Sequence, residues 1–175
     1  MHKQDDCNIR PMQAEDLEMV LKWRNHSSIR QHMITQHLIT ADEHQQWFEQ
    51  TSSDPHRTIM LVEHQGAPFG LVHFTGTLAQ ASVDWGFYVA PDARKGSGNH
   101  LGKCALAFAF EQLSVQKVCG QVLASNEVSI RFHERLGFSF EGRLREHVLI
   151  PPNHQDLLCF GLLKGEWLQI SHHKG

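Results

Sequence analysis

Apolar residues in the first part of the chain recur with a helical period. Residues 9–11 have the character of a short strand, and the next segment, residues 14–25, is expected to form an amphipathic helix. Its apolar stripe consists of Leu17, Val20, Leu21 and Trp23. Residues 27–33 are expected to form a second short helix or a turn.

A capping-box pattern marks the start of the next helix. The Thr40 hydroxyl can accept from the amide three residues later, and Glu43 can reach back to the amide of residue 40. The pattern predicts a helix that runs to about residue 50 and buries Trp47 and Phe48.

The pattern then changes to the period of strands. Residues 58–63 and 69–75 are expected to pair as a hairpin around Gln65 and Gly66, which are typical turn residues. Residues 82–89 form a further strand, which must end before Pro91 because proline cannot donate to a ladder.

The second half of the chain alternates between the two periods. It predicts a helix over 99–113, a strand over 117–124 and a helix over 126–136 that ends at Gly137. Strands are expected at 138–143 and 157–163, with a loop at 151–153. Hairpins followed by alternating elements are typical of a mixed α/β fold.

Composition and charge narrow the class of protein. The 175 residues fit one domain spanning 1–175, and 41% hydrophobic with 20% charged residues is an ordinary globular balance. The net charge of -3 shows no basic excess, so no nucleic-acid partner is expected. No apolar run approaches the roughly 20 residues that span a bilayer, so no membrane partner is expected either.

The same reasoning places the protein in the cytoplasm. The N-terminal residues lack the apolar stretch of a secretory signal. The cysteines, Cys7, Cys104, Cys119 and Cys159, are far apart and are expected to be reduced thiols. The 14 histidines include no H-E-x-x-H or comparable ligand set, so no metal site is expected.

One segment combines a strand end, a glycine-rich turn and the start of a helix. Glycines let the backbone approach a ligand closely, and the free amides at a helix N-terminus bind anions such as a pyrophosphate. The turn comprises Arg94, Lys95, Gly96, Ser97, Gly98 and Asn99. Taken alone, it is equally well read as a plain strand-to-helix turn.

A second motif follows the next strand. It consists of Asn126, Ser129 and the pair Gly137 and Phe138. With the glycine-rich turn, in this order and at this spacing, the segment 82–140 resembles the GNAT acetyltransferases. The resemblance implies the GNAT fold, a central mixed twisted sheet of about seven strands flanked by helices. It also implies acetyl-CoA as acetyl donor and direct transfer to an amine without a covalent enzyme intermediate.

Shorter motifs suggest a subgroup. They occupy residues 23–25, 40–44, 85–88, 122–126 and 141–145, so this resemblance spans nearly the whole chain. They resemble the sugar-nucleotide acetyltransferases of pseudaminic acid biosynthesis. The acceptor implied is UDP-4-amino-4,6-dideoxy-N-acetyl-β-L-altrosamine.

The resemblance also implies a set of residues around acetyl-CoA. The amide near Val89 would polarise the thioester oxygen, and the amides of residues 95–99 would hold the pyrophosphate. Asn126 would bind the pantetheine arm or a water, or simply cap a helix. Arg135 would meet the 3′-phosphate or remain a solvated charge. The full set is Phe87, Tyr88, Val89, Arg94, Lys95, Gly96, Ser97, Gly98, Asn99, Asn126, Ser129, Phe132 and Arg135.

This chain departs from the family pattern at three positions. Ala93 stands where the loop often has Gln or Arg, unless Arg94 takes that role. His133 replaces the tyrosine general acid; it either donates as imidazolium or merely packs beside coenzyme A. Gln121 replaces a glutamate base, and a glutamine can position a water but cannot take a proton. The base is therefore open between Asp84, His73 and a chain of waters.

The acceptor is expected to lie against the N-terminal helices. Arg24 and Arg30 suit phosphate because guanidinium can bind it bidentately. His44 and His73 could add polar contacts. Trp23 could face a sugar or base, although a tryptophan at helical spacing is more often a core residue.

Two other functions compete with this interpretation. A ribosomal-protein-type N-terminal acetyltransferase would share the opening motif but need an acidic groove for a peptide amine. A coenzyme A-binding module without catalysis would explain the missing tyrosine and Gln121. The sequence does not specify the oligomeric state and leaves open a homodimer.

Overall fold

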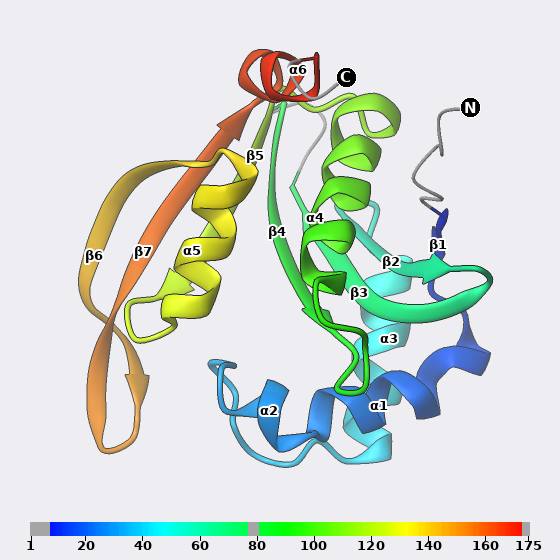
Figure 1. Ribbon diagram of the computed structural model, residues 1–175. Helices are drawn as coiled ribbons and strands as arrows, with labels where there is room; N and C mark the ends of the chain where they lie inside the picture. The colour runs from blue at the N-terminus through cyan, green and yellow to red at the C-terminus, as the bar shows by residue number, and fades with distance from the viewer. Residues whose placement is uncertain (1–7, 77–80, 173–175) are drawn as a thin grey trace. The chain divides into compact units, whose positions relative to one another are not determined.

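The computed structural model describes residues 8–76 and 81–172. Seven strands form one mixed sheet in the order β1-β2-β3-β4-β5-β7-β6 (Figure 1). β4 (Ser82–Val89) and β5 (Lys117–Leu123) are parallel, whereas the β1–β2, β2–β3, β5–β7 and β6–β7 pairs are antiparallel. The mixed seven-stranded sheet with flanking helices confirms the fold that the resemblance implied.

Contacts divide the chain into two compact units, each described here by itself. The first comprises residues 1–75 and 86–105, and the second residues 76–85 and 106–175. The boundary crosses β4 and the helix α4 (Ser97–Ala107), so both elements contribute residues to both units.

The first unit contains the antiparallel strands β1 (Asn8–Pro11), β2 (Arg57–His64) and β3 (Ala67–Thr75). The turn between β2 and β3 places both Gln65 and Gly66 at positive φ, 52° and 77°, as a two-residue hairpin requires. The predicted hairpin is confirmed.

Helices cover one face of these strands. They are the single turn η1 (Ala14–Asp16), α1 (Leu17–Asn25), α2 (Ser27–Arg30) and α3 (Ala41–Ser53). The predicted capping box of α3 is present, with Thr40 accepting from the Glu43 amide and Glu43 accepting from the Thr40 amide. Trp47 and Phe48 are only partly buried, but both pack against the core.

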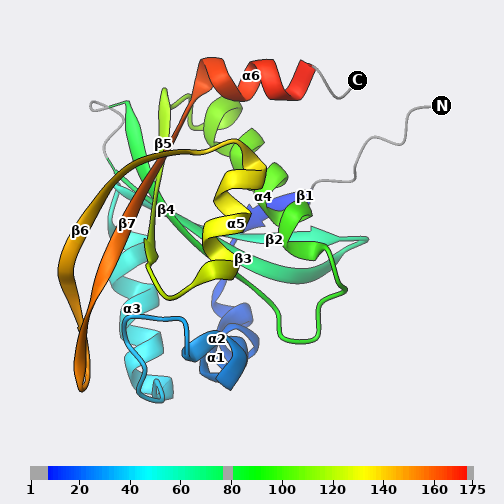
Figure 2. The same ribbon diagram turned by 60° about the vertical axis from the view of Figure 1, so that its left-hand side comes forward.

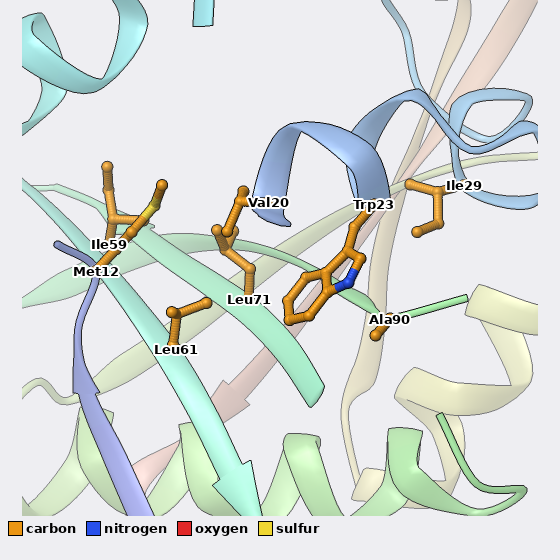
Figure 3. Packing of buried hydrophobic residues seen from close by; sticks show 8 residues of the cluster. All are labelled: Met12, Val20, Trp23, Ile29, Ile59, Leu61, Leu71 and Ala90. Carbon is orange, nitrogen blue, oxygen red and sulfur yellow. The ribbon is translucent and has the colours of Figure 1, made fainter. Parts of the chain in front are cut away.

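The core of this unit lies between α1 and the strands. Val20 and Trp23 of α1 meet Ile59, Leu61 and Leu71 of β2 and β3 (Figure 3). Burying side chains of this size contributes about 1.5–3 kcal/mol each. This packing, more than helix propensity, stabilises the short helix α1.

The second unit is built around β5. α5 (Glu127–Leu136) packs against the sheet, and β6 (Ser139–Ile150) and β7 (Asn153–Leu163) form a long hairpin (Figure 2). α4 continues into a π-helical turn, η3 (Phe108–Gln112), and α6 (Lys164–His172) ends the described chain.

Several predicted boundaries were wrong. α4 begins at Ser97 instead of 99, and β6 and β7 are longer than expected because the loop is confined to Pro151 and Pro152. α6 was not predicted. Cys119 and Cys159 are free thiols, as expected, whereas Cys104 is disulfide-bonded; Cys7 is outside the described residues. In the described residues, no helix is long and apolar enough to cross a membrane.

Candidate active site

The first unit holds the glycine-rich turn. Its start is fixed by the Ala90 amide, which donates to the Phe69 carbonyl at 2.7 Å. Gly96 has a φ of +93°, and a Cβ added there would meet no atom within 4 Å. The backbone at Gly96 is therefore open to an approaching group.

α4 begins directly after this turn. The first turn of a helix leaves amides without intrahelical partners, and its dipole favours an anion. Arg94 and Lys95 are exposed beside these amides. The open backbone, the helix N-terminus and the two cations fit the pyrophosphate group of acetyl-CoA. When bound, acetyl-CoA would supply the activated acetyl group.

Tyr88, the chain's single tyrosine, follows on β4. It packs against the core of the first unit, and burial raises the pKa of its hydroxyl, an effect that the nearby Arg24 charge opposes. The hydroxyl therefore stays protonated and can donate. Phe87 and Val89 beside it are only partly buried.

Arg24 occupies the same face of the first unit. Its Nη2 donates to the Thr35 carbonyl at 2.8 Å. Its Nη1 is buried and has no hydrogen-bond partner among the residues that the structure describes. Burial lowers the pKa of the guanidinium; Tyr88 opposes this effect and the Arg30 charge adds to it. The group is thus a half-buried cation whose buried Nη1 is unpaired among the described residues.

His44 lies near the Arg24 charge. Burial and then Arg24 lower the pKa of His44, so its imidazole is neutral at pH 7. It stacks on Trp47 with the ring centroids 5.1 Å apart. Arg30 also forms a hydrogen bond within the chain, because its Nη1 donates to the Gln36 carbonyl at 3.2 Å.

Trp23 has a different place. Only 8% of it is exposed, and its side chain is enclosed by the apolar cluster shown in Figure 3. The structure therefore supports the core alternative, and the prediction of contact with a sugar or base finds no support.

His73 points from β3 toward β4. A Cβ added at Gly86 would lie 2.2 Å from Nε2 and 2.6 Å from Cε1 of His73, so the imidazole lies directly over the Gly86 backbone. Burial and then the Arg57 charge lower the pKa of His73. The ring is partly accessible and neutral at pH 7.

The second unit holds the α5 residues. Asn126 caps α5, its side-chain oxygen accepting from the Ser129 amide at 3.1 Å. The capping alternative is therefore confirmed, and a ligand contact of Asn126 stays a prediction. Arg135 is exposed, which fits both roles considered for it.

His133 is 2% exposed and surrounded by aromatic rings. Its Nε2 accepts from Trp85 Nε1 at 3.1 Å, and its Nδ1 lies 2.8 Å from the Ser129 carbonyl oxygen. Burial lowers its pKa, although the bond to Ser129 opposes this effect. A buried neutral imidazole with both nitrogens bonded supports the packing alternative and gives the general-acid prediction no support.

Gly120 of β5 has no side chain, and this leaves space for the hydrogen-bonded pair Trp85 and His133. A Cβ there would lie 2.4 Å from His133 Nε2 and 2.9 Å from Trp85 Nε1. Phe132, predicted to meet coenzyme A, is 6% exposed and stacks on Trp85 with the ring centroids 6.3 Å apart. Its burial assigns it to the core of this unit.

Two candidates lie on the face of β4 and β5 that points away from Trp85 and His133. Asp84 and Gln121 are exposed, and partial burial raises the pKa of the Asp84 carboxyl. Asp84 is the register partner of Cys119, whose pKa is raised by burial. An exposed carboxylate can accept a proton, so the assignment of Asp84 stays a prediction.

The structure thus brings together Arg24, His44 and Tyr88, with His73 on the same sheet face, in the first unit. It places Asn126, Phe132 and His133 together on α5 in the second. Within residues 8–76 and 81–172, no three His, Cys, Asp or Glu side chains are placed to hold a metal ion.

Sequence reasoning missed the roles of Trp85 and Gly86. Nothing in a single sequence pairs Trp85 with a histidine 48 residues away. Gly86 did carry a signal, because a glycine inside a strand often marks a close approach by another group.

Comparison with known proteins identifies the family of the chain. Residues 7–139 match the acetyltransferase (GNAT) domain family. The SPbeta prophage-derived uncharacterized N-acetyltransferase YokL of Bacillus subtilis (strain 168) is 28% identical over 172 residues, covering 96% of this chain and 95% of YokL. The acetyltransferase PseH of Campylobacter jejuni subsp. jejuni (serotype O:23/36, strain 81-176) is 26% identical over 132 residues, covering 75% and 82%.

A solved structure shows the same fold. It is the spermidine N-acetyltransferase of Vibrio cholerae in complex with CoA and spermine, with a TM-score of 0.86 and 23% identity. The match covers 94% of this chain and 99% of that one.

Proposed function

The chain belongs to the acetyltransferase (GNAT) family, and from this premise we propose that its acceptor is the 4-amino group of a UDP-linked amino-dideoxy sugar, as in pseudaminic acid biosynthesis. The coarser activity follows from the family: the protein is an N-acetyltransferase with acetyl-CoA as its donor.

The unpaired Nη1 of Arg24 carries the proposal. Leaving a buried charged donor unpaired is costly, and a phosphate oxygen would satisfy it with a charge-assisted hydrogen bond. The protonated Tyr88 hydroxyl and the neutral His44 near Arg24 can add contacts to the same anion. A UDP-sugar brings two phosphates to this face, and a free amine or peptide does not.

The charge of residues 17–40 points the same way. Between residues 17 and 40 the only acidic residue is Glu18, and it is paired with Lys22 at 2.7 Å. Arg24 and Arg30 therefore keep their positive charge uncompensated by carboxylates of this segment. The segment attracts an anionic acceptor and repels a cationic one.

A polyamine is the second candidate. It is favoured by the likeness to the Vibrio cholerae spermidine N-acetyltransferase, although identity of 23% supports the fold alone. A spermidine cation would need carboxylates where this chain has Arg24 and Arg30. The resemblance to the sugar-nucleotide subgroup and the match to PseH favour the sugar.

A panel of acceptors tests the proposal. Release of the coenzyme A thiol would be followed with the UDP-4-amino sugar, spermidine, a ribosomal N-terminal peptide and no acceptor. We expect release above background with the sugar alone. Release with spermidine but not the sugar would replace the proposal with polyamine acetylation, and release with the peptide alone would favour the ribosomal alternative.

A further inference from the structure

His73 lies on the face of the first unit where the acceptor is proposed to bind. Its register partner is Ile59, which belongs to the core beneath α1, and cross-strand partners point to the same face. Gly86 and Tyr88 alternate with Phe87 along β4, so both point to this face as well. His73, Gly86 and Tyr88 therefore line one surface.

Gly86 is what allows the ring to lie there. Any side chain at position 86 would collide with His73, because even a Cβ would come within 2.2 Å of Nε2. The glycine lets the Nε2 edge of the imidazole pack against the β4 backbone. Gly86 is three residues from Val89, or roughly 10 Å along an extended strand.

As a neutral imidazole, His73 has one ring nitrogen that can accept a proton. His73 is partly accessible, and neither nitrogen has a hydrogen-bond partner among the described residues. Arg57 of β2 is the charged group that affects the pKa of His73. The neighbours of His73, Ile59 and Gly86, carry no charge. His133, by contrast, has both nitrogens bonded.

We propose that His73 is the general base that removes the proton from the acceptor amine, and that Gly86 is required to place its ring. The proposal rests on the N-acetyltransferase activity proposed above and adds the residue that activates the nucleophile. It selects His73 over Asp84 and a chain of waters.

The proton balance is simple. The acceptor binds as an ammonium ion and loses one proton through a bridging water to a ring nitrogen of His73. The free amine then forms the N–C bond to the acetyl carbonyl as the C–S bond breaks. As the amide forms, the nitrogen loses a second proton, and the leaving thiolate takes that proton to give the free thiol. His73 returns the first proton to solvent, so each turnover releases one proton.

The test is the pH dependence of kcat/KM for the acceptor in His73→Gln. Glutamine fills a similar volume but cannot take the proton. At pH 7 we expect a loss of about 10²-fold, the lower range for one general base. The loss should shrink toward high pH, as solution deprotonation of the amine replaces the base, and KM for acetyl-CoA should stay unchanged.

Matched variants separate chemistry from folding. His56→Gln makes the same substitution at an exposed position and should retain full activity. Gly86→Ala should displace the ring and reproduce the pH profile of His73→Gln. An acceptor analogue whose amine has a low pKa should be acetylated almost equally by wild type and His73→Gln, since it needs no base.

A second readout needs no substrate. The imidazole signal of His73, assigned by its loss in His73→Gln, should titrate below pH 6.5 in the NMR spectrum of the protein alone. A loss of activity that is equal at every pH, with normal folding, would overturn the proposal and leave His73 a structural residue.

The two proposals fail separately. The kinetic test uses whichever amine the wild type acetylates. If the UDP-sugar is not an acceptor but spermidine is, the proposed acceptor is wrong, and the pH profile with spermidine still decides the role of His73.

Discussion

Trp85 donates its indole N–H to Nε2 of His133 across 3.1 Å, inside the core of the second unit. This bond leaves Nδ1 to carry the proton, which is donated to the Ser129 carbonyl at 2.8 Å. A second proton on Nε2 would face the indole N–H and have no acceptor. The pair therefore requires a neutral imidazole.

The first prediction concerns stability against pH. The folded state holds the pKa of His133 below its ordinary value. The contribution of neutral His133 to the free energy of unfolding is therefore complete above about pH 6.5 and is lost as the pH falls through the folded pKa. We expect the free energy of unfolding to fall below pH 6.5, and His133→Phe to remove part of that slope. Urea unfolding of wild type and His133→Phe at pH 5, 6, 7 and 8 measures this pH dependence.

The same variant distinguishes packing from catalysis. His133→Phe removes the acceptor of the Trp85 N–H, at a cost of about 1–3 kcal/mol at neutral pH. If the residue were a general acid, kcat would collapse while stability stayed the same. Stability unchanged and kcat lost would contradict the packing assignment.

A second prediction concerns Arg24. Arg24→Lys keeps the charge but removes the planar fork, so KM for the UDP-sugar should rise by about 10-fold or more, as expected for a lost charge-assisted hydrogen bond. KM for acetyl-CoA should not change. Steady-state kinetics with each substrate varied in turn measures both values.

Lys22→Met is the control for Arg24, because it removes a cation from the same helix whose partner is the exposed Glu18. It should leave both KM values unchanged. Equal effects of the two variants would show that general charge, and not a specific contact, attracts the acceptor.

A third prediction concerns the ion-pair network of the first unit. Arg10 donates to both Asp16 and Glu63, at 2.7 Å and 2.6 Å, and Asp16 also accepts from the Gln13 amide. The Arg10 hydrogen bond holds the pKa of Asp16 below its ordinary value. This contribution is complete above about pH 3.9 and is lost as the pH falls through the folded pKa.

Asp16→Asn should therefore lower the free energy of unfolding by about 1–3 kcal/mol at pH 7, with allowance for the partial exposure of Arg10. The difference from wild type should narrow below pH 3.9 in acid-unfolding experiments. Glu18→Gln, at a fully exposed pair, should show no measurable change. A difference independent of pH would assign the effect of Asp16 to shape instead of charge.

Local features of this fold were readable from the sequence. The capping box of α3, the Gln65–Gly66 turn and the left-handed Gly137 after α5 depend on residues within a few positions of one another. The sharp turn at Gly96, with a φ of +93°, was readable for the same reason. Each is decided by local sterics and hydrogen bonds.

Long-range features were not readable. Arg10 meets Glu63 across 53 positions and His133 meets Trp85 across 48, so no local pattern announces either contact. The family motif left position 133 open between catalysis and packing, and only the structure shows it enclosed in the core. The lengths of β6 and β7 are likewise set by their pairing.

The last prediction concerns Thr51 of α3. It is 4% exposed, and its hydroxyl oxygen is buried with no hydrogen-bond partner in the described part of the chain. Valine has nearly the same shape and also branches at Cβ, so helix propensity changes little. Thr51→Val should raise the free energy of unfolding by about 1 kcal/mol, because an unpaired buried polar group is removed.

Thr51→Ser is the matched variant, since it keeps the hydroxyl but deletes the buried methyl group. It should be less stable than wild type, by about 1 kcal/mol for the lost methyl. Urea unfolding of all three proteins at pH 7 gives the order Val, Thr, Ser. If Thr51→Val is instead the least stable, the hydroxyl has a partner in solution and the buried face of α3 is hydrated there.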